Sequence, residues 1–204
     1  MLDLLFAQYK GYSFFFITLE ITAVLFGIIS VLFARKNNIL VYPTGLISTL
    51  IFIYILYNFK LYGEFIINIY YSVMSILGWY FWSRRTNGQE EFPISILNSK
   101  EYKISGLIFT ATLLFIALVY HFFDKFTDLT AYFDAFTTAL FFVGMWLMSK
   151  RKIENWIVWI IADIISVPLY FYKGLTVSSL QFIVFTIIAI LGYKEWKKYL
   201  TKQI

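Results

Sequence analysis

The sequence predicts an all-α integral membrane protein with seven transmembrane helices, and three observations support this fold class. Only 14% of the 204 residues are charged while 60% are hydrophobic, a composition far from that of a soluble domain. Several apolar runs approach or exceed the roughly 18–20 residues that cross a hydrocarbon core of about 30 Å. An internal repeat relates the first three runs to the last three. We expect a single membrane transport domain over residues 1–204.

Short connections separate the apolar runs, with one exception at residues 84–103. The predicted helices span residues 13–33, 39–57, 62–83, 104–123, 128–148, 155–172 and 176–193. The long linker contains Arg84, Arg85, Asn87, Gly88 and Pro93, and it is the predicted internal boundary.

The basic residues predict the orientation of these helices. With the N-terminus outside and the C-terminus inside, 13 of the 17 basic residues fall on the inner side, as the positive-inside rule requires. The inner residues are Arg35, Lys36, Arg84, Arg85, Lys100, Lys103, Lys150, Arg151, Lys152, Lys194, Lys197, Lys198 and Lys202. The outer residues are Lys10, Lys60, Lys125 and Lys173. The net charge of +5 is therefore explained by topology, and we expect no nucleic-acid partner.

Matching residues recur 114 positions apart and indicate an internal repeat. The pairs are Glu20 and Asp134, Tyr42 and Trp156, Leu61 and Leu175, Ser72 and Thr186, Gly78 and Gly192, and Trp82 and Trp196. They predict repeat 1 over about 13–83, a connector helix over about 104–123 and repeat 2 over about 128–196. Because one helix separates the repeats, both cross the membrane in the same direction. A 3+1+3 arrangement of this kind is a transporter architecture with its substrate site between the repeats.

Asp163 is the sharpest candidate for a functional residue. It lies near the middle of an apolar helix, where an ionised carboxylate costs about 2.5–3.5 kcal/mol and must face the bundle interior with a partner. Trp156 and Trp159 share its helix face, and tryptophan binds cationic or electron-poor rings by stacking. The alternatives are an interhelical hydrogen bond or a protonated acid for Asp163, and an interfacial aromatic belt for Trp156.

A second candidate face lies on the predicted helix 62–83. Asn68, Tyr71 and Ser75 are spaced at i, i+3 and i+7, so they lie on one side of that helix. They are candidate substrate contacts, with ordinary interhelical hydrogen bonding as the alternative. Gln181 in the last helix is a weaker candidate for the lining of the pathway.

Two acids recur in the repeat, Glu20 and Asp134, each roughly two turns from the outer end of its helix. We favour an architectural role for both, with proton or sodium coupling as the alternative. His121 is the only histidine and cysteine is absent, so we expect no catalytic constellation, no metal site and no cofactor. No phosphate-binding glycine loop is present, which excludes transport driven by an ATPase of this chain.

Other seven-helix proteins fit less well. A retinal photoreceptor needs a lysine deep in its last helix, and residues 176–193 contain none. A peptide or hormone receptor does not predict an internal repeat. A neutral-sugar transporter stays structurally compatible, although an acid beside tryptophans suits a cation better.

The segments ENWIVWIIADIISVPLYFYKGL and INIYYSVMSILGWYFW resemble the Pnu family of bacterial vitamin transporters, of which PnuC is the best-known branch. The resemblance covers nearly the whole chain and includes Glu20, the Gly78-Trp79 pair, Asp134, Lys173-Gly174, and Glu154-Asn155-Trp156 with Trp159. It implies a fold related to the SWEET sugar transporters, and ligand contacts at Trp156, Trp159, Asp163, Asn68 and the Asn155 signature. It also implies facilitated diffusion of an unphosphorylated vitamin across the bacterial inner membrane, trapping by a cytoplasmic kinase, and a homotrimer.

Two positions depart from the nicotinamide riboside branch of that family. That branch usually has asparagine at the position of Asp163 and glutamine at the position of Asn68. A carboxylate only accepts hydrogen bonds, so it suits an aminopyrimidine or a cationic ring. Thiamine has both, and this sequence looks more like the thiamine branch, PnuT. We therefore expect thiamine as the substrate, with nicotinamide riboside, whose pyridinium also suits an acid, as the alternative.

Overall fold

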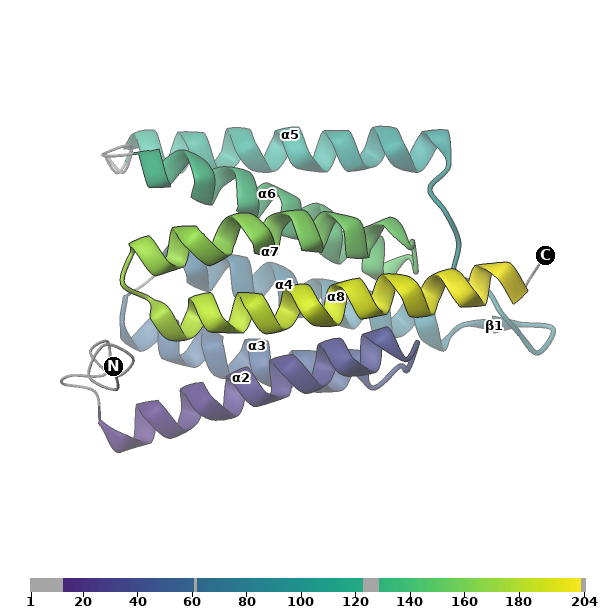
Figure 1. Cartoon of the computed structure of the whole chain (residues 1–204), viewed down its shortest axis with the longest axis horizontal. Helices are drawn as coiled ribbons and strands as arrows, with labels where there is room; N and C mark the ends of the chain where they lie inside the picture. The colour runs from purple at the N-terminus through teal and green to yellow at the C-terminus, as the bar shows by residue number, and fades with distance from the viewer. Residues whose placement is uncertain (1–12, 61, 123–128, 203–204) are drawn as a thin grey trace. The chain divides into compact units, whose positions relative to one another are not determined.

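The computed structural model describes residues 13–60, 62–122 and 129–202, and the chain divides into two compact units. The first unit, Met1–Pro93, contains α2 (Phe14–Arg35), α3 (Val41–Asn58), α4 (Tyr62–Ser83) and a hairpin of β1 (Arg85–Thr86) and β2 (Gln89–Glu90). The second unit, Ile94–Ile204, contains α5 (Ser99–Phe122), α6 (Leu129–Ser149), α7 (Glu154–Tyr172) and α8 (Thr176–Lys202) (Figure 1). Lys10, Lys125 and Leu61, used above for the orientation and the repeat, lie outside the described residues.

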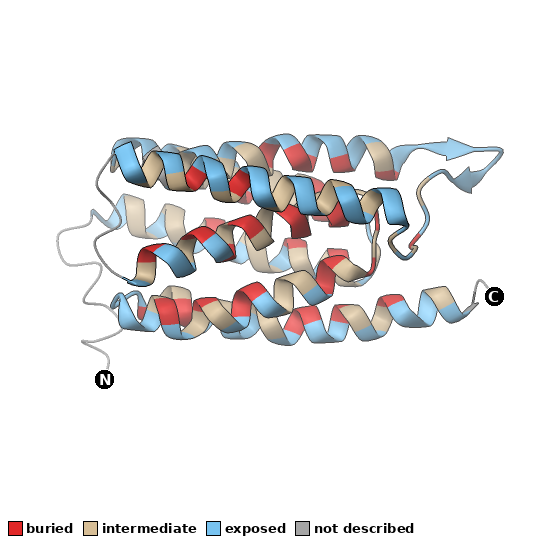
Figure 2. Cartoon of the chain, turned by 90° about the horizontal axis from the view of Figure 1, so that it is seen from above, coloured by how far each residue is buried: buried red, intermediate tan, exposed pale blue. Residues whose placement is uncertain are grey.

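Seven helices of the described chain are long and apolar enough to cross a membrane. Exposed positions run along the helices (Figure 2). Many of them carry large apolar side chains, for example Leu107, Leu114 and Leu118 on α5. In water such continuous apolar surface would drive aggregation, whereas in a bilayer it faces the lipid. The prediction of an all-α, multi-pass membrane protein is therefore confirmed.

Small residues let the helices of each unit approach closely. On α6 the buried stripe is spaced by four residues and consists of Ala131, Ala135, Ala139, Val143 and Leu147. This helix packs against α5 and α7, and α7 packs against α8. In the first unit α3 packs against α2 and α4. Without a hydrophobic force between helices in lipid, close packing of this kind and interhelical hydrogen bonds hold the bundle together.

Serine hydroxyls supply interhelical hydrogen bonds in the first unit. Ser30 Oγ donates to the carbonyl of Val41 at 2.7 Å, and Ser48 Oγ donates to the carbonyl of Ala23 at 2.7 Å. Both bonds join α2 to α3, and both serines are buried. They satisfy the hydroxyl groups inside the unit, where water is excluded.

The α2–α3 turn and the α6–α7 turn have the same backbone geometry. Two residues beyond the end of each first helix lies a residue with positive φ, Asn37 at 51° and Arg151 at 51°. In both turns the next amide bonds the carbonyl five residues earlier, Asn38 to Phe33 and Lys152 to Leu147, each at 2.9 Å. This is the Schellman C-cap, here without glycine. The two turns lie 114 residues apart.

Three features differ from the sequence-based expectations. Helix α5 begins at Ser99 rather than at residue 104, because Asn98 and Glu101 cap its start reciprocally. The Glu101 amide donates to Asn98 Oδ1 at 2.9 Å, and the Asn98 amide donates to Glu101 Oε2 at 3.0 Å. Helix α8 continues to Lys202 rather than 193, since hydropathy detects only the part of a helix that lies in lipid. Within the linker, Asn87-Gly88 forms the turn of the β1–β2 hairpin, with φ of 55° and 80°.

Candidate functional site

The candidate site is the inward face of α7. Its buried residues recur at helical spacing and include Asn155, Trp156, Asp163 and Ser166. The helix is positioned by α6 and α8, against which it packs, and it starts directly after the α6–α7 turn. The structure therefore keeps the predicted aromatic and acidic residues of this helix on one side of it.

Trp156 is fully buried and packed on several sides. Its ring lies edge-on to Trp159 and to Trp196, with centroids 5.5 Å apart in both pairs. A Cβ on Gly192 would come within 2.7 Å of the Trp156 ring, so only glycine leaves room for it. Most of the Trp156 indole is thus engaged in packing within the second unit.

The first unit contains an equivalent aromatic cluster. Tyr42 lies edge-on to Trp82 at 5.1 Å, and a Cβ on Gly78 would meet the Tyr42 ring at 2.2 Å. Tyr42, Trp82 and Gly78 occupy the positions 114 residues before Trp156, Trp196 and Gly192. This shared packing indicates that Trp156 serves the architecture of the unit.

Trp159 has no aromatic equivalent in the first unit. The position 114 residues earlier is Gly45, whose added Cβ would lie 2.9 Å from Ser30 Oγ. In the second unit the corresponding position holds the large side chain of Trp159, and a Cβ on Gly144 would lie 2.2 Å from its Nε1. Trp159 is half-buried, unlike Trp156. Of the two tryptophans it is therefore the better candidate for contact with a ligand.

Asp163 is only 3% exposed and forms no hydrogen bond or ion pair with the described residues. One turn further along, the hydroxyl of Ser166 is fully buried and has no hydrogen-bond partner in the part of the chain that the structure describes. Asn155 donates from Nδ2 to the carbonyl of Lys152 at 2.5 Å, while its Oδ1 and the Nε1 of Trp156 have no partner. Buried polar groups are nearly always satisfied, so this face has the chemistry to accept a polar ligand.

The candidates on α4 belong to the first unit. Asn68 Nδ2 donates to the carbonyl of Glu64 in its own helix at 2.9 Å. Tyr71 is half-buried, with its ring 5.9 Å from that of Tyr70. Ser75 is buried, and it lies near the close contact of Gly45 with Ser30. A ligand role for these three residues stays a prediction, as does that of the half-buried Gln181 on α8.

The acids Glu20 and Asp134 lie on α2 of the first unit and on α6 of the second. Asp134 on α6 forms an ion pair with Lys173 at the end of α7, through Oδ2 and Nζ. Lys173 also lies 5.6 Å from the centre of the Tyr170 ring. Glu20 on α2 is half-buried and has an interaction partner. The Asp134 contact ties two helices together, which favours the architectural interpretation.

We predict that Asp134→Asn lowers the free energy of unfolding by about 1 kcal/mol, because it removes the charge that pairs with Lys173. Thermal unfolding in detergent measures this, and Lys173→Met combined with Asp134→Asn should cost little more than either change alone. An uptake rate that loses a dependence on a sodium or proton gradient in Asp134→Asn would instead indicate ion coupling.

Two features of the site were not predicted. Ser166 is spaced at i+3 from Asp163 and at i+7 from Trp159, so helical spacing could have included it. Gly144 faces Trp159 from α6, a contact between helices that spacing along one helix does not reveal. Among the described residues no group of three or more His, Cys, Asp or Glu could hold a metal ion.

Seven helices able to span a membrane and a buried polar face on α7 define a multi-pass membrane protein with polar groups inside one of its helix bundles. Residues 17–198 match the family model described as nicotinamide mononucleotide transporter, and the chain belongs to this family. It is a membrane transporter, and the Pnu-family resemblance is confirmed at this level.

Named relatives cover most of the chain. The nicotinamide riboside transporter PnuC of Escherichia coli K12 is 26% identical over 201 residues, covering 87% of this chain and 84% of that protein. PnuC of Neisseria mucosa is 28% identical over 185 residues, covering 84% and 69%. The riboflavin/roseoflavin transporter RibM of Streptomyces davaonensis is 22% identical over 174 residues, covering 83% and 80%. A crystal structure of the vitamin B3 transporter PnuC matches 90% of this chain and 82% of its own, with 25% identity and a TM-score of 0.66.

Proposed function

We propose that this transporter takes up an unphosphorylated vitamin with a cationic ring by facilitated diffusion, and that the vitamin is nicotinamide riboside. The observation that carries the proposal is the buried carboxylate of Asp163, which has no partner among the described residues and lies one turn from the half-buried Trp159. A positively charged pyridinium can stack on an indole while its charge faces an acid. Two relatives named above for nicotinamide riboside support this ligand.

This proposal reverses the order of substrates expected from the sequence. Thiamine was favoured there, but the relatives named above transport nicotinamide riboside or riboflavin. Thiamine is the second candidate because Asp163 has the acceptor that its aminopyrimidine and thiazolium need. The side chains that would pair with either vitamin are the same, so the ligand must be separated by measurement.

We also infer that the two units are repeats with α5 as the connector, in the parallel 3+1+3 arrangement. The matched Schellman turns and the two aromatic clusters with their glycines support the inference. The distribution of basic residues supports an N-terminus outside and a C-terminus inside a bacterial inner membrane. A homotrimer and a cytoplasmic kinase that traps the vitamin are proposed from the family resemblance alone.

Titration of the purified protein, followed by tryptophan fluorescence, tests the ligand. We expect nicotinamide riboside to quench the fluorescence saturably, and its phosphorylated form, nicotinamide mononucleotide, to have no effect. Thiamine and thiamine monophosphate form the matched second pair. Binding of thiamine alone would establish the second candidate, and binding of neither vitamin would contradict the proposal.

Facilitated diffusion is tested with the same vitamin in proteoliposomes. Radiolabelled nicotinamide riboside should equilibrate to equal concentrations inside and outside. Collapse of a sodium or proton gradient should leave the rate unchanged. At zero membrane potential, accumulation above the external concentration would show that an ion is coupled to transport.

A further inference from the structure

The last residues of the linker bind the α6–α7 turn inside the second unit. Ser95 lies parallel to Lys152 as a β-bridge. The amide of Ser95 donates to the carbonyl of Arg151 at 3.1 Å, and the amide of Ile153 donates to the carbonyl of Ser95 at 3.0 Å. Ile94 is 2% exposed, so the linker is anchored by an apolar side chain as well.

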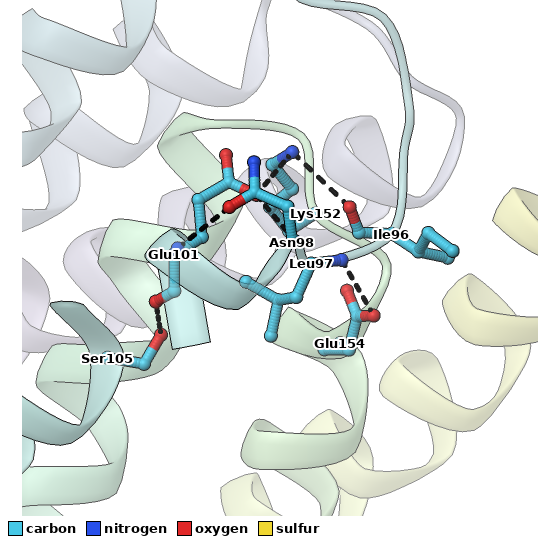
Figure 3. Close-up of polar contacts among 7 residues, drawn as sticks. All are labelled: Ile96, Leu97, Asn98, Glu101, Ser105, Lys152 and Glu154. Carbon is cyan, nitrogen blue, oxygen red and sulfur yellow. Dashed lines mark hydrogen bonds and ion pairs between the residues drawn. The ribbon is translucent and has the colours of Figure 1, made fainter. Parts of the chain in front are cut away.

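Three side-chain contacts reinforce the bridge (Figure 3). The amide of Leu97 donates to Glu154 Oε1 at 3.0 Å, and Lys152 Nζ donates to the carbonyl of Ile96 at 3.4 Å. Lys152 also forms an ion pair with Glu101 at 2.8 Å, with 11% and 19% of the two side chains exposed. An ion pair shielded to this degree is screened less than one at the surface. We call this set of contacts, from Ser95 to Glu101 on one side and Arg151 to Glu154 on the other, the linker clamp.

The clamp ends one residue before the candidate site. Glu154 is the first residue of α7, and Asn155 and Trp156 follow it. The carbonyl of Lys152 accepts the side-chain amide of Asn155 at 2.5 Å, while its ammonium group contacts Glu101. A movement of Lys152 is therefore transmitted directly to the first turn of α7.

The equivalent turn of the first unit is closed in another way. The position 114 residues before Lys152 is Asn38, and its Oδ1 accepts the amide of Leu40 at 2.9 Å. That turn is thus stabilised by its own side chain. The second unit has lysine at this position and uses the linker instead. In the unit that carries the acidic site, the turn before α7 is held by the linker.

We propose that Glu101 and Lys152 are positioning residues whose ion pair holds the first turn of α7, and thereby Asn155, Trp156 and Trp159, in the geometry that binds the vitamin. The choice of ligand rests on the proposed function. The mechanical part of the proposal does not, because all of its contacts lie within the second unit.

The test replaces Glu101 with Gln, which keeps an acceptor for the Asn98 amide but removes the charge. We expect the Kd for nicotinamide riboside to rise about three- to tenfold. Amide hydrogen exchange at residues 153–159 should become faster than in the wild type. Glu91→Gln is the matched control, since it removes the Arg84–Glu91 ion pair of 2.7 Å at the hairpin. It should change neither quantity.

A double-mutant cycle tests whether the two residues act as a pair. Lys152→Met should have the same effect as Glu101→Gln, and the double variant should be no worse than either one. Lys152→Arg, which keeps the charge, should restore binding. Unchanged Kd in both single variants, or faster exchange without a change in Kd, would overturn the positioning role.

The two proposals fail in different ways. If the wild-type protein binds no nicotinamide riboside, the proposed vitamin is wrong. The linker-clamp proposal is then tested by amide hydrogen exchange at residues 153–159 and by the tryptophan emission maximum. If neither quantity changes in Glu101→Gln or Lys152→Met, the clamp proposal is overturned as well.

Discussion

Replacing Asp163 with Asn is expected to weaken nicotinamide riboside binding by about 1–3 kcal/mol, roughly 5- to 150-fold in Kd. The carboxylate is buried and has no partner among the described residues, so a cationic ligand would supply its missing counter-charge. Asparagine keeps the size of the side chain and removes the charge. Titration of both proteins by tryptophan fluorescence or calorimetry measures the difference.

The reduced form of nicotinamide riboside is the matched control ligand. Its ring is neutral, while its ribose and carboxamide are unchanged. If Asp163 faces the ring charge, only the oxidised vitamin loses affinity in Asp163→Asn. If Asp163 accepts a hydrogen bond from the carboxamide, both forms lose affinity. Equal affinities in wild type and variant for both forms would remove Asp163 from the site.

The same substitution should not destabilise the protein without ligand. A buried carboxylate without a partner costs free energy in the folded state, and an amide in its place costs less. The melting temperature of ligand-free Asp163→Asn should equal or exceed that of the wild type. A substitution that weakens binding while preserving stability is typical of a residue kept for function.

The class of fold was predictable because it follows from chemistry that a sequence displays. Apolar runs of about 20 residues determine the number of spanning helices, and Asp163 stands out because charge is rare in such runs. The boundaries of α5 and α8 were less predictable. The start of α5 depends on the cap between Asn98 and Glu101, and the end of α8 lies among charged residues that hydropathy ignores.

Contacts between helices were beyond sequence reasoning. The spacing of Trp156, Trp159 and Asp163 showed that they share a face of one helix, but not that Trp156 is enclosed by Trp196 and Gly192. The linker clamp was missed for the same reason. Its contacts join residues more than 50 positions apart, and a polar linker gives no sign of which turn it binds.

The two units differ at one pair of positions that lie 114 residues apart. In the first unit Gly45 and Ser30 meet as two small residues, while the corresponding positions in the second hold Trp159 and Gly144. Both pairs are in close contact, and in the second unit one partner is an indole. The aromatic cluster of Tyr42 and Trp82 is retained with Trp156 and Trp196. The difference therefore falls on Trp159, next to Asp163 on the same helix.

Gly144→Ala is expected to displace the Trp159 indole and to raise the Kd for nicotinamide riboside by about tenfold or more. The added Cβ would lie 2.2 Å from Nε1 and 2.3 Å from Cδ1 of Trp159, well inside van der Waals contact. The indole must move, because the new Cβ is fixed to the backbone of α6. Ligand titration measures the loss, and a shift of the tryptophan emission maximum reports the displaced ring.

Gly106→Ala on α5 is the matched control, because a Cβ at that position meets nothing within 4 Å. It should leave Kd and emission unchanged, with a melting temperature equal to or above that of the wild type. Combining Gly144→Ala with Trp159→Phe distinguishes a steric effect from a general loss of structure. The smaller ring relieves the clash, so the double variant should bind no more weakly than Trp159→Phe alone. Wild-type affinity in Gly144→Ala would mean that Trp159 is free to move without cost and does not hold the ligand.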